Sequence, residues 1–395
     1  TEEELVVSAL KNPQTVSKSP AIMSVVTAKQ IKQMGFRTLT QVLKIVPGFD
    51  ISMDRTGETD IGVRGVLKRT SEIVKVLIDG HSVNDPFTGG ASFNFDDLVV
   101  ENAKRIEIIR GPGSALYGQN AFLAVINVIT KDTEDIDGFQ WTLSYGSFDR
   151  QQYNMLFAKE VGDLKISGYF DYFDTNGFSE TVDQDILFPK SFSQSPGRSH
   201  NKKEKIDLNL KLSYKNLEIK GKYMNKRREG YIGIGDALNN DTNLRDSYLF
   251  GELVYKMPLG EKLTNISRVY YDLYDFDPLL KQRPNGFVGP FLNQSGLPAI
   301  GFYPNGMEGK PSLKDMTIGF ENQINYHVFQ GNELTFGFQY EWIHQYDIKS
   351  SEFTFNPLTL APLPEPTDFS DTLPFTRKVT RQIAALYLQD EWNIS

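Results

Sequence analysis

The sequence predicts a membrane β-barrel preceded by a small α+β domain. From about residue 139 the chain alternates polar and apolar residues over long stretches that are rich in Tyr and Phe. Before that point it carries short helical and strand patterns separated by turn residues. We therefore expect three parts: a flexible N-terminus (residues 1–12), a compact domain (13–133) and a barrel region (139–395).

Residues 205–214 give the clearest barrel strand. Ile206, Leu208 and Leu210 face one side, while Lys205 and Asp207 face the other. Ten residues at roughly 3.3 Å each suit a tilted, membrane-spanning strand. Less perfect alternation predicts further strands at residues 164–175, 217–226, 247–257, 263–276, 316–326, 333–345 and 379–393.

The connections between the strands are alternately short and long, apart from the first hairpin at residues 146–150, which is short where a long one is due. Links at residues 161–163, 215–216, 258–262 and 329–332 are short, whereas those at 176–203, 227–246, 277–312 and 346–378 are long. Short turns on one rim and long loops on the other are typical of outer-membrane barrels. The pattern predicts about ten strands. Because the lumen of so small a barrel is filled by its own side chains, we interpret the region as the N-terminal portion of a larger barrel.

The first domain begins with a short strand before Thr27, which caps a helix over residues 28–34. Thr38 caps a second helix over residues 39–45. Strands are expected at residues 49–53, 60–64, 74–78, 104–110 and 124–130. The last two are apolar on both faces, which predicts a buried sheet.

Composition limits the chemistry that the chain can perform. It has 395 residues, no cysteine and a formal net charge of −8, so thiol chemistry is excluded and a nucleic-acid partner is not expected. The glycines between residues 111 and 118 miss the spacing of a phosphate-binding loop. We find no catalytic constellation and no metal-ligand cluster, so we expect neither an enzyme nor a cofactor. The chain opens on Thr-Glu-Glu-Glu, so we expect any export signal to have been removed.

Four segments in order carry a family resemblance: residues 39–48 (LTQVLKIVPG), 61–65 (IGVRG), 76–80 (VLIDG) and 105–131. With them, the chain resembles the TonB-dependent outer-membrane receptors. The resemblance implies that the first domain is a plug inside the lumen of a barrel that has 22 strands when complete.

The resemblance also identifies a candidate TonB box near the N-terminus. TonB, acting with its inner-membrane energising complex, would pair with this segment as an added strand. A short, β-prone and unpatterned peptide suits such pairing, although composition alone also fits a frayed terminus. The residues concerned are Glu4, Leu5, Val6, Val7, Ser8 and Ala9.

Arg64 and Arg110 align with plug arginines that, in the family, face carboxylates of the barrel wall. Bidentate guanidinium–carboxylate pairing would lock the plug in place, with Glu107 in the same network. The alternative is that each arginine only caps a polar strand end.

The family's ligands contact plug apices, which here correspond to residues 53–59 and 85–94. The residues expected to contact ligand are Asp54, Arg55, Thr56, Phe87 and Phe93, with an ordinary solvated loop as the alternative. Further polar and aromatic residues lie near the bases of the long loops, among them Arg228. His81 and His344 are isolated and do not by themselves indicate haem.

Together these features predict TonB-dependent import of a scarce ligand, most often a ferric siderophore, across the bacterial outer membrane. The N-terminus would be periplasmic, the long loops extracellular and the barrel in contact with outer-membrane lipid. The alternatives are a cobalamin, haem or glycan importer of the same fold, or a plugged surface barrel that attaches to partner proteins without transporting anything.

Overall fold

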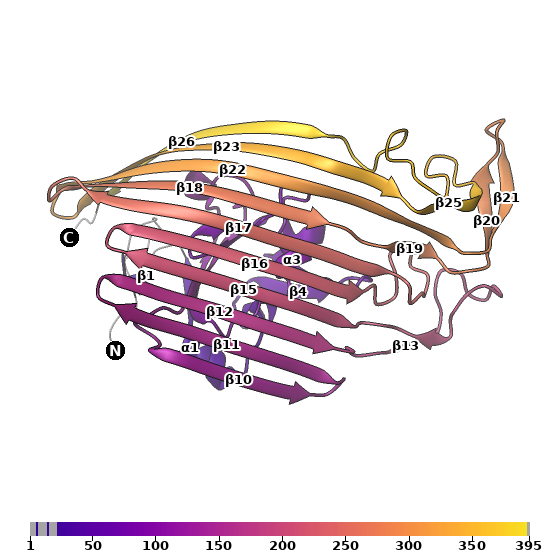
Figure 1. Cartoon of the computed structure of the whole chain (residues 1–395), viewed down its shortest axis with the longest axis horizontal. Helices are drawn as coiled ribbons and strands as arrows, with labels where there is room; N and C mark the ends of the chain where they lie inside the picture. The colour runs from indigo at the N-terminus through magenta and orange to yellow at the C-terminus, as the bar shows by residue number, and fades with distance from the viewer. Residues whose placement is uncertain (1–4, 7–13, 16–21, 393–395) are drawn as a thin grey trace.

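The structure, a computed structural model, describes residues 5–6, 14–15 and 22–392. A large antiparallel sheet curves around a smaller N-terminal domain, which lies on its concave side (Figure 1). The N-terminal domain is therefore the plug, and the curved sheet is the barrel wall.

The plug is built on a sheet of order β3-β8-β9-β6-β7. These strands are β3 (Met23–Thr27), β8 (Ala103–Arg110), β9 (Ala124–Thr130), β6 (Val74–Ile78) and β7 (His81–Ser82). The pairing of β6 with β9 is parallel, and the other pairings are antiparallel. As predicted, β8 and β9 are mostly buried.

Helix α1 (Ala28–Met34) has the predicted bounds and caps. The Thr27 hydroxyl accepts from the Gln30 N–H, and the Gln30 side chain accepts from the Thr27 N–H, an arrangement that pairs two otherwise unsatisfied amides. Gly35 ends the helix at φ 68°. Helix α2 ends two residues earlier than predicted (Leu39–Leu43). The other plug elements are β4 (Phe49–Met53), β5 (Thr59–Val63), the 3-10 turn η2 (Arg69–Ser71), α3 (Ser92–Phe95) and α4 (Ser114–Tyr117).

The barrel wall is a sheet of eleven strands, ten on a continuous path and β19 (Leu280–Arg283) beside β22. The structure confirms the predicted bounds of the strands at residues 164–175 and 263–276. The path runs through β10 (Gly138–Gly146), β11 (Arg150–Val161), β12 (Leu164–Thr175), β15 (Lys203–Tyr214), β16 (Leu217–Glu229), β17 (Asn243–Pro258), β18 (Leu263–Phe276), β22 (Met307–Phe329), β23 (Asn332–Ser351) and β26 (Val379–Trp392).

Short turns and long loops lie at opposite ends of the wall, as predicted, apart from the short turn between β10 and β11 at the long-loop end (Figure 1). Three of the long loops contain small antiparallel strand pairs, which the alternation pattern did not predict. The prediction also cut β22 and β23 short, since both strands continue well into the loop region. The loop strands are β13 (Thr181–Val182), β14 (Gly197–Arg198), β20 (Phe287–Leu292), β21 (Pro298–Tyr303), β24 (Phe353–Phe355) and β25 (Pro362–Thr367).

Alternation along the strands gives the wall two different faces. Leu210, Leu253 and Leu386 are exposed on the convex face, whereas Lys222 and Asp207 are buried on the concave face. An apolar outer face and a polar inner face are what a lipid-embedded barrel requires. Among the helices of the described residues, none is long and apolar enough to cross a membrane.

We expect Leu210→Arg to destabilise the barrel by about 2–4 kcal/mol, because a lipid-facing charge near the bilayer midplane must be desolvated. The measurement is the free energy of unfolding in lipid vesicles. Leu210→Met is the matched control and should change it by less than about 1.5 kcal/mol. Equal effects of the two substitutions would contradict a lipid-facing position.

Candidate functional site: the interface between plug and barrel wall

The hairpin between β6 and β7 brings the plug against the wall. Asp79 and Gly80 form its turn at φ 48° and 79°, the left-handed geometry that tight hairpins use. The Asp79 carboxylate accepts from the N–H (2.8 Å) and hydroxyl (2.6 Å) of Thr130 on β9. Its carbonyl accepts from Lys220 Nζ on β16 at 2.8 Å. The turn is therefore tied both to its own sheet and to the barrel.

His81 follows this turn and is buried among wall residues. Its Nε2 lies 2.7 Å from Asp272 Oδ1, and its Nδ1 lies 3.8 Å from Glu252 Oε1. The ring stacks on Phe250 at 4.0 Å and meets Tyr270 edge-on. Burial alone lowers the pKa of His81 by disfavouring the charged ring, but the two carboxylates outweigh burial and raise that pKa above 6.5.

Glu252 joins this histidine to a wider network on the wall. It pairs with Lys220 Nζ and with Arg268 Nε, both at 2.7 Å. Arg268 also lies 3.3 Å from Glu321 on β22. Because the charges alternate in sign, each buried carboxylate has a cation beside it.

A second set of ion pairs joins the plug to β15 and β16. Lys205 Nζ donates to the Asp97 carbonyl at 2.6 Å and lies 3.2 Å from its carboxylate. Lys226 pairs with Asp96, and Arg228 pairs with Glu58. We call these three contacts the anchor pairs. Burial raises the pKa of Asp97, but Lys205 and Lys226 outweigh burial and hold that pKa low.

The predicted apex residues Asp54, Arg55 and Thr56 share one loop but point to different partners. Asp54 Oδ1 accepts from the N–H and hydroxyl of Thr56, at 2.8 and 2.7 Å, and Thr56 is buried. Arg55 reaches both oxygens of Asp236 in the loop at residues 227–246, at 3.0 and 2.9 Å. The Thr56 side chain therefore stabilises the loop itself, while Arg55 joins the apex to a barrel loop.

The predicted pair Phe87 and Phe93 does come together, around the wall residue Phe276. The ring centroids lie 5.7 Å (Phe87) and 5.8 Å (Phe93) from that of Phe276. Phe375, from the loop at residues 346–378, lies 5.8 Å from Phe87. These four rings form an aromatic cluster that links a plug apex to the wall and to a long loop.

The predicted lock residues contact backbone of the plug. Arg64 Nη2 donates to the Arg110 carbonyl at 3.0 Å, and Arg110 Nη1 lies 3.4 Å from the Pro47 carbonyl. Glu107 is buried and pairs with Arg105 Nε at 2.7 Å. Pairing of Arg64 and Arg110 with barrel carboxylates therefore stays a prediction.

The candidate TonB box is described in part. Leu5 and Val6 form β1, which pairs antiparallel with β2 (Gln14–Thr15). Glu4, Val7, Ser8 and Ala9 lie outside the described residues.

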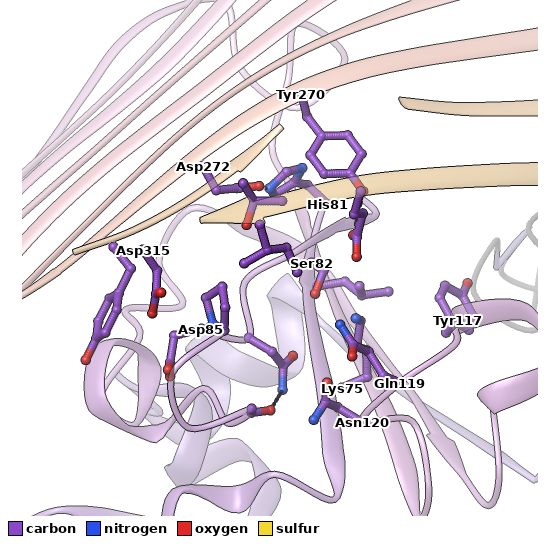
Figure 2. A pocket seen from close by; sticks show the side chains of 18 of the residues that line it. Lys75, His81, Ser82, Asp85, Tyr117, Gln119, Asn120, Tyr270, Asp272 and Asp315 are labelled. Carbon is purple, nitrogen blue, oxygen red and sulfur yellow. Dashed lines mark hydrogen bonds and ion pairs between the residues drawn. The ribbon is translucent and has the colours of Figure 1, made fainter. Parts of the chain in front are cut away.

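A cavity of about 310 Å³ separates the plug from the wall formed by β18, β22, β23 and β26. Figure 2 shows its lining, with Asp85 and Gln119 on the plug side and Tyr270, Asp272 and Asp315 on the wall. Burial raises the pKa of Asp85 to about 7, although its hydrogen bonds to Thr88 oppose the shift. Among the described residues, no group of three His, Asp or Glu side chains is arranged to hold a metal ion.

Sequence reasoning missed the anchor pairs and the role of His81. It predicted that plug arginines pair with wall carboxylates, whereas these contacts have plug carboxylates and wall cations. The usable signal was a run of alternate cations on β16, at residues 220, 222, 226 and 228, beside two adjacent acids at residues 96–97.

Fold and site together define a plugged β-barrel, in which a separate domain is held against the inner wall by buried charge pairs. Residues 15–125 match the family model of the TonB-dependent receptor plug domain. These residues therefore form a plug domain of the TonB-dependent receptor type.

One curated protein and two solved structures are also similar to this chain. The chain is 34% identical over 196 residues to the vitamin B12 transporter BtuB of Vibrio vulnificus (strain CMCP6), a match covering 48% of this chain and 30% of that protein. The solved ferripyoverdine receptor of the Pseudomonas aeruginosa outer membrane superposes with a TM-score of 0.68 at 14% identity, covering 99% of this chain and 52% of that one. The Acinetobacter baumannii ferric preacinetobactin receptor BauA superposes with a TM-score of 0.65 at 12% identity, and the match covers 98% of this chain and 57% of that one. The chain thus spans about half the length of these solved receptors, whose low identity shows the fold alone.

We expect His81 to make plug docking dependent on pH. The pKa of His81 is higher in the folded than in the unfolded protein. Its ion pair therefore stabilises the docked plug fully below pH 6.5, and this stabilisation is lost as the pH rises through the pKa of the folded protein. Amide exchange in the β6–β7 hairpin, corrected for intrinsic rates, should therefore speed up above pH 6.5. Asp85 acts in the same direction, because its raised pKa penalises the folded state as pH rises towards 7.

Comparing His81→Gln with Asp85→Asn separates the two contributions. Each variant should lose part of the pH dependence. If His81→Gln keeps all of it, the imidazole is not the group that titrates.

We expect Lys226→Met to destabilise the folded protein by about 3–5 kcal/mol, because it leaves Asp96 buried without its cation. The double variant Lys226→Met/Asp96→Leu should recover most of that loss. The measurement is the free energy of unfolding of each variant in urea. A double variant as unstable as the single one would show that Asp96 is not paired with Lys226.

Proposed function

We propose that this protein is an energised importer of a scarce ligand across the bacterial outer membrane. Its N-terminus would be periplasmic and its long loops extracellular. The observation that carries the proposal is the plug itself, which lies against the inner wall and is held there by the anchor pairs. A lumen blocked in this way passes no solute until the plug changes its contacts, and that change needs a source of work.

TonB is the partner that we propose for this work. The candidate box at residues 4–9 precedes the plug, and its described part, Leu5–Val6, is extended. An extended segment can add a strand to a partner by backbone hydrogen bonding. Pulling on this segment would act first on β3, the plug strand that follows it.

We propose that the ligand binds at the extracellular side, between the plug apices and the long loops. Arg55 and the aromatic cluster both connect a plug apex to a barrel loop. A ligand that contacts both parts would bind the docked and released plug with different affinities. Such differential affinity is what a transmembrane signal requires.

A ferric chelate is the ligand class that we favour. Several structural neighbours are described as receptors of ferric complexes, namely ferripyoverdine, ferric preacinetobactin and ferric enterobactin. Cobalamin is the second candidate, because the curated relative is described as a vitamin B12 transporter. Quenching of intrinsic fluorescence by ferripyoverdine, ferric enterobactin and cyanocobalamin, each titrated into the purified protein, separates the two classes.

We expect deletion of residues 1–9 to abolish uptake, by at least about tenfold, while surface binding stays near normal. The reason is that the box acts in energy transfer and lies apart from the apices that hold the ligand. The measurements are accumulation of the radiolabelled ligand in cells and its binding to de-energised cells. Scrambling Leu5–Ser8 is the matched control and should behave like the deletion. Loss of binding as well would contradict this assignment of the box.

A further inference from the structure

The plug meets the described wall in two different ways. Against β15 and β16 it is fastened by the anchor pairs, whose side chains are nearly all removed from solvent. Against β18, β22, β23 and β26 it borders the 310 Å³ cavity. One face of the plug is thus fastened by the anchor pairs, and the other combines direct contacts, such as His81 with Asp272, with open volume.

The plug side of this cavity is a loop that is stabilised by its own hydrogen bonds. Asp85 accepts from the N–H and the hydroxyl of Thr88, both at 2.7 Å. The Gly89 N–H donates to the Asp85 carbonyl at 2.9 Å, and the Asp85 N–H donates to the Gly90 carbonyl at 2.8 Å. The internal bonds let residues 84–90 move as a unit, while the bonds of the Asn84 side chain to the Val76 N–H and the Val74 carbonyl on β6 have to break or move with it.

The contacts between this loop region and the wall lie just before the loop and in its middle. Before the loop, His81 pairs with Asp272 and the Ser82 carbonyl lies 3.3 Å from the hydroxyl of Tyr248. Within the loop, Arg381 Nη2 donates to the Pro86 carbonyl at 2.9 Å, and the Phe87 ring packs against Phe276 of β18.

The wall side of the cavity contains a buried acceptor suited to a passing ligand. Asp315 is 2% exposed and lines the cavity, and its Oδ2 has no hydrogen-bond partner among residues 22–392. Buried carboxylate oxygens normally accept a hydrogen bond. Glu341, Gln339 and Tyr270 also line the cavity. The lining therefore suits polar groups that donate hydrogen bonds better than apolar ones.

We propose that the ligand passes the plug along this cavity, between the loop at residues 84–90 and the wall of β18, β22, β23 and β26, while the anchor pairs stay closed. This inference rests on the proposed function, because it locates the opening that energised import requires. The loop moves away from the wall when the contacts of His81, Phe87 and Arg381 break. The passage is lined by hydrogen-bonding side chains and admits a polar, donor-rich ligand.

The test is thiol accessibility in living cells, for which the absence of cysteine from the chain gives a clean background. Thr317→Cys places a thiol in the cavity lining on β22. Ser167→Cys is the matched control on the inner face of β12. Thr317 and Ser167 are 6% and 7% exposed. Both positions are therefore buried while the plug is docked, and faster labelling at either one indicates that the interface has opened there. The probe is a membrane-impermeant maleimide, applied to cells with and without TonB, so no ligand has to be known.

We expect Thr317→Cys to be labelled at least about tenfold faster in cells that contain TonB, and Ser167→Cys to change less than about twofold, because only the cavity side opens. Faster labelling of Ser167→Cys, or equal gains at both positions, would overturn the proposed route while leaving import intact. If TonB changes the labelling rate at neither position, both the proposed function and the proposed route are overturned. Adding His81→Gln should raise the labelling of Thr317→Cys in cells without TonB, and no increase would contradict the role of that contact in closing the passage.

Discussion

The exclusion of water between plug and wall is the constraint on which the rest of the structure depends. Alternation along a barrel strand sends every second side chain into the lumen, and in this chain many of those side chains are charged. Once the plug occupies the lumen, these charges lose bulk solvent, and an unpaired buried charge costs several kcal/mol. Some wall cations are paired within the wall, as Lys220 is with Glu252, and others need a carboxylate from the plug, as Lys226 needs Asp96. The same requirement places His81 between Asp272 and Glu252.

Pairing of this kind fixes the orientation of the plug more than its strength of attachment. A hydrophobic contact tolerates a small rotation, whereas a buried ion pair that is misaligned leaves two charges without partners. The anchor pairs come from three different plug residues and two adjacent strands, so they define one rotational position. The position of the cavity on the other face follows from that orientation.

Sequence patterns revealed the faces of the strands but not the partners across the interface. Alternation over residues 205–214 correctly placed Lys205 and Asp207 in the lumen, because the period of a strand is a local property. The partner of Lys226 is 130 residues away in sequence, and no local pattern encodes that distance. His81 was an isolated histidine in the sequence, and its setting depends on wall residues from β17 and β18. The extension of β22 beyond its alternating segment depends on pairing with β19 and β23, which is likewise non-local.

The order of the plug sheet constrains how a pull at the N-terminus can open the lumen. In the order β3-β8-β9-β6-β7, the strand nearest the box lies at one edge and the strand carrying His81 lies at the other. Peeling strands one by one from β3 would have to unzip β8, β9 and β6, which are mostly or fully buried, before it reached His81. If the sheet slides or tilts as a unit, the pull is transmitted to its far edge without unzipping the buried strands. The force then acts directly on the contacts of β7. Because the loop at residues 84–90 is held together by its own bonds and borders open volume, it is the part of the described interface that can yield while the core stays folded.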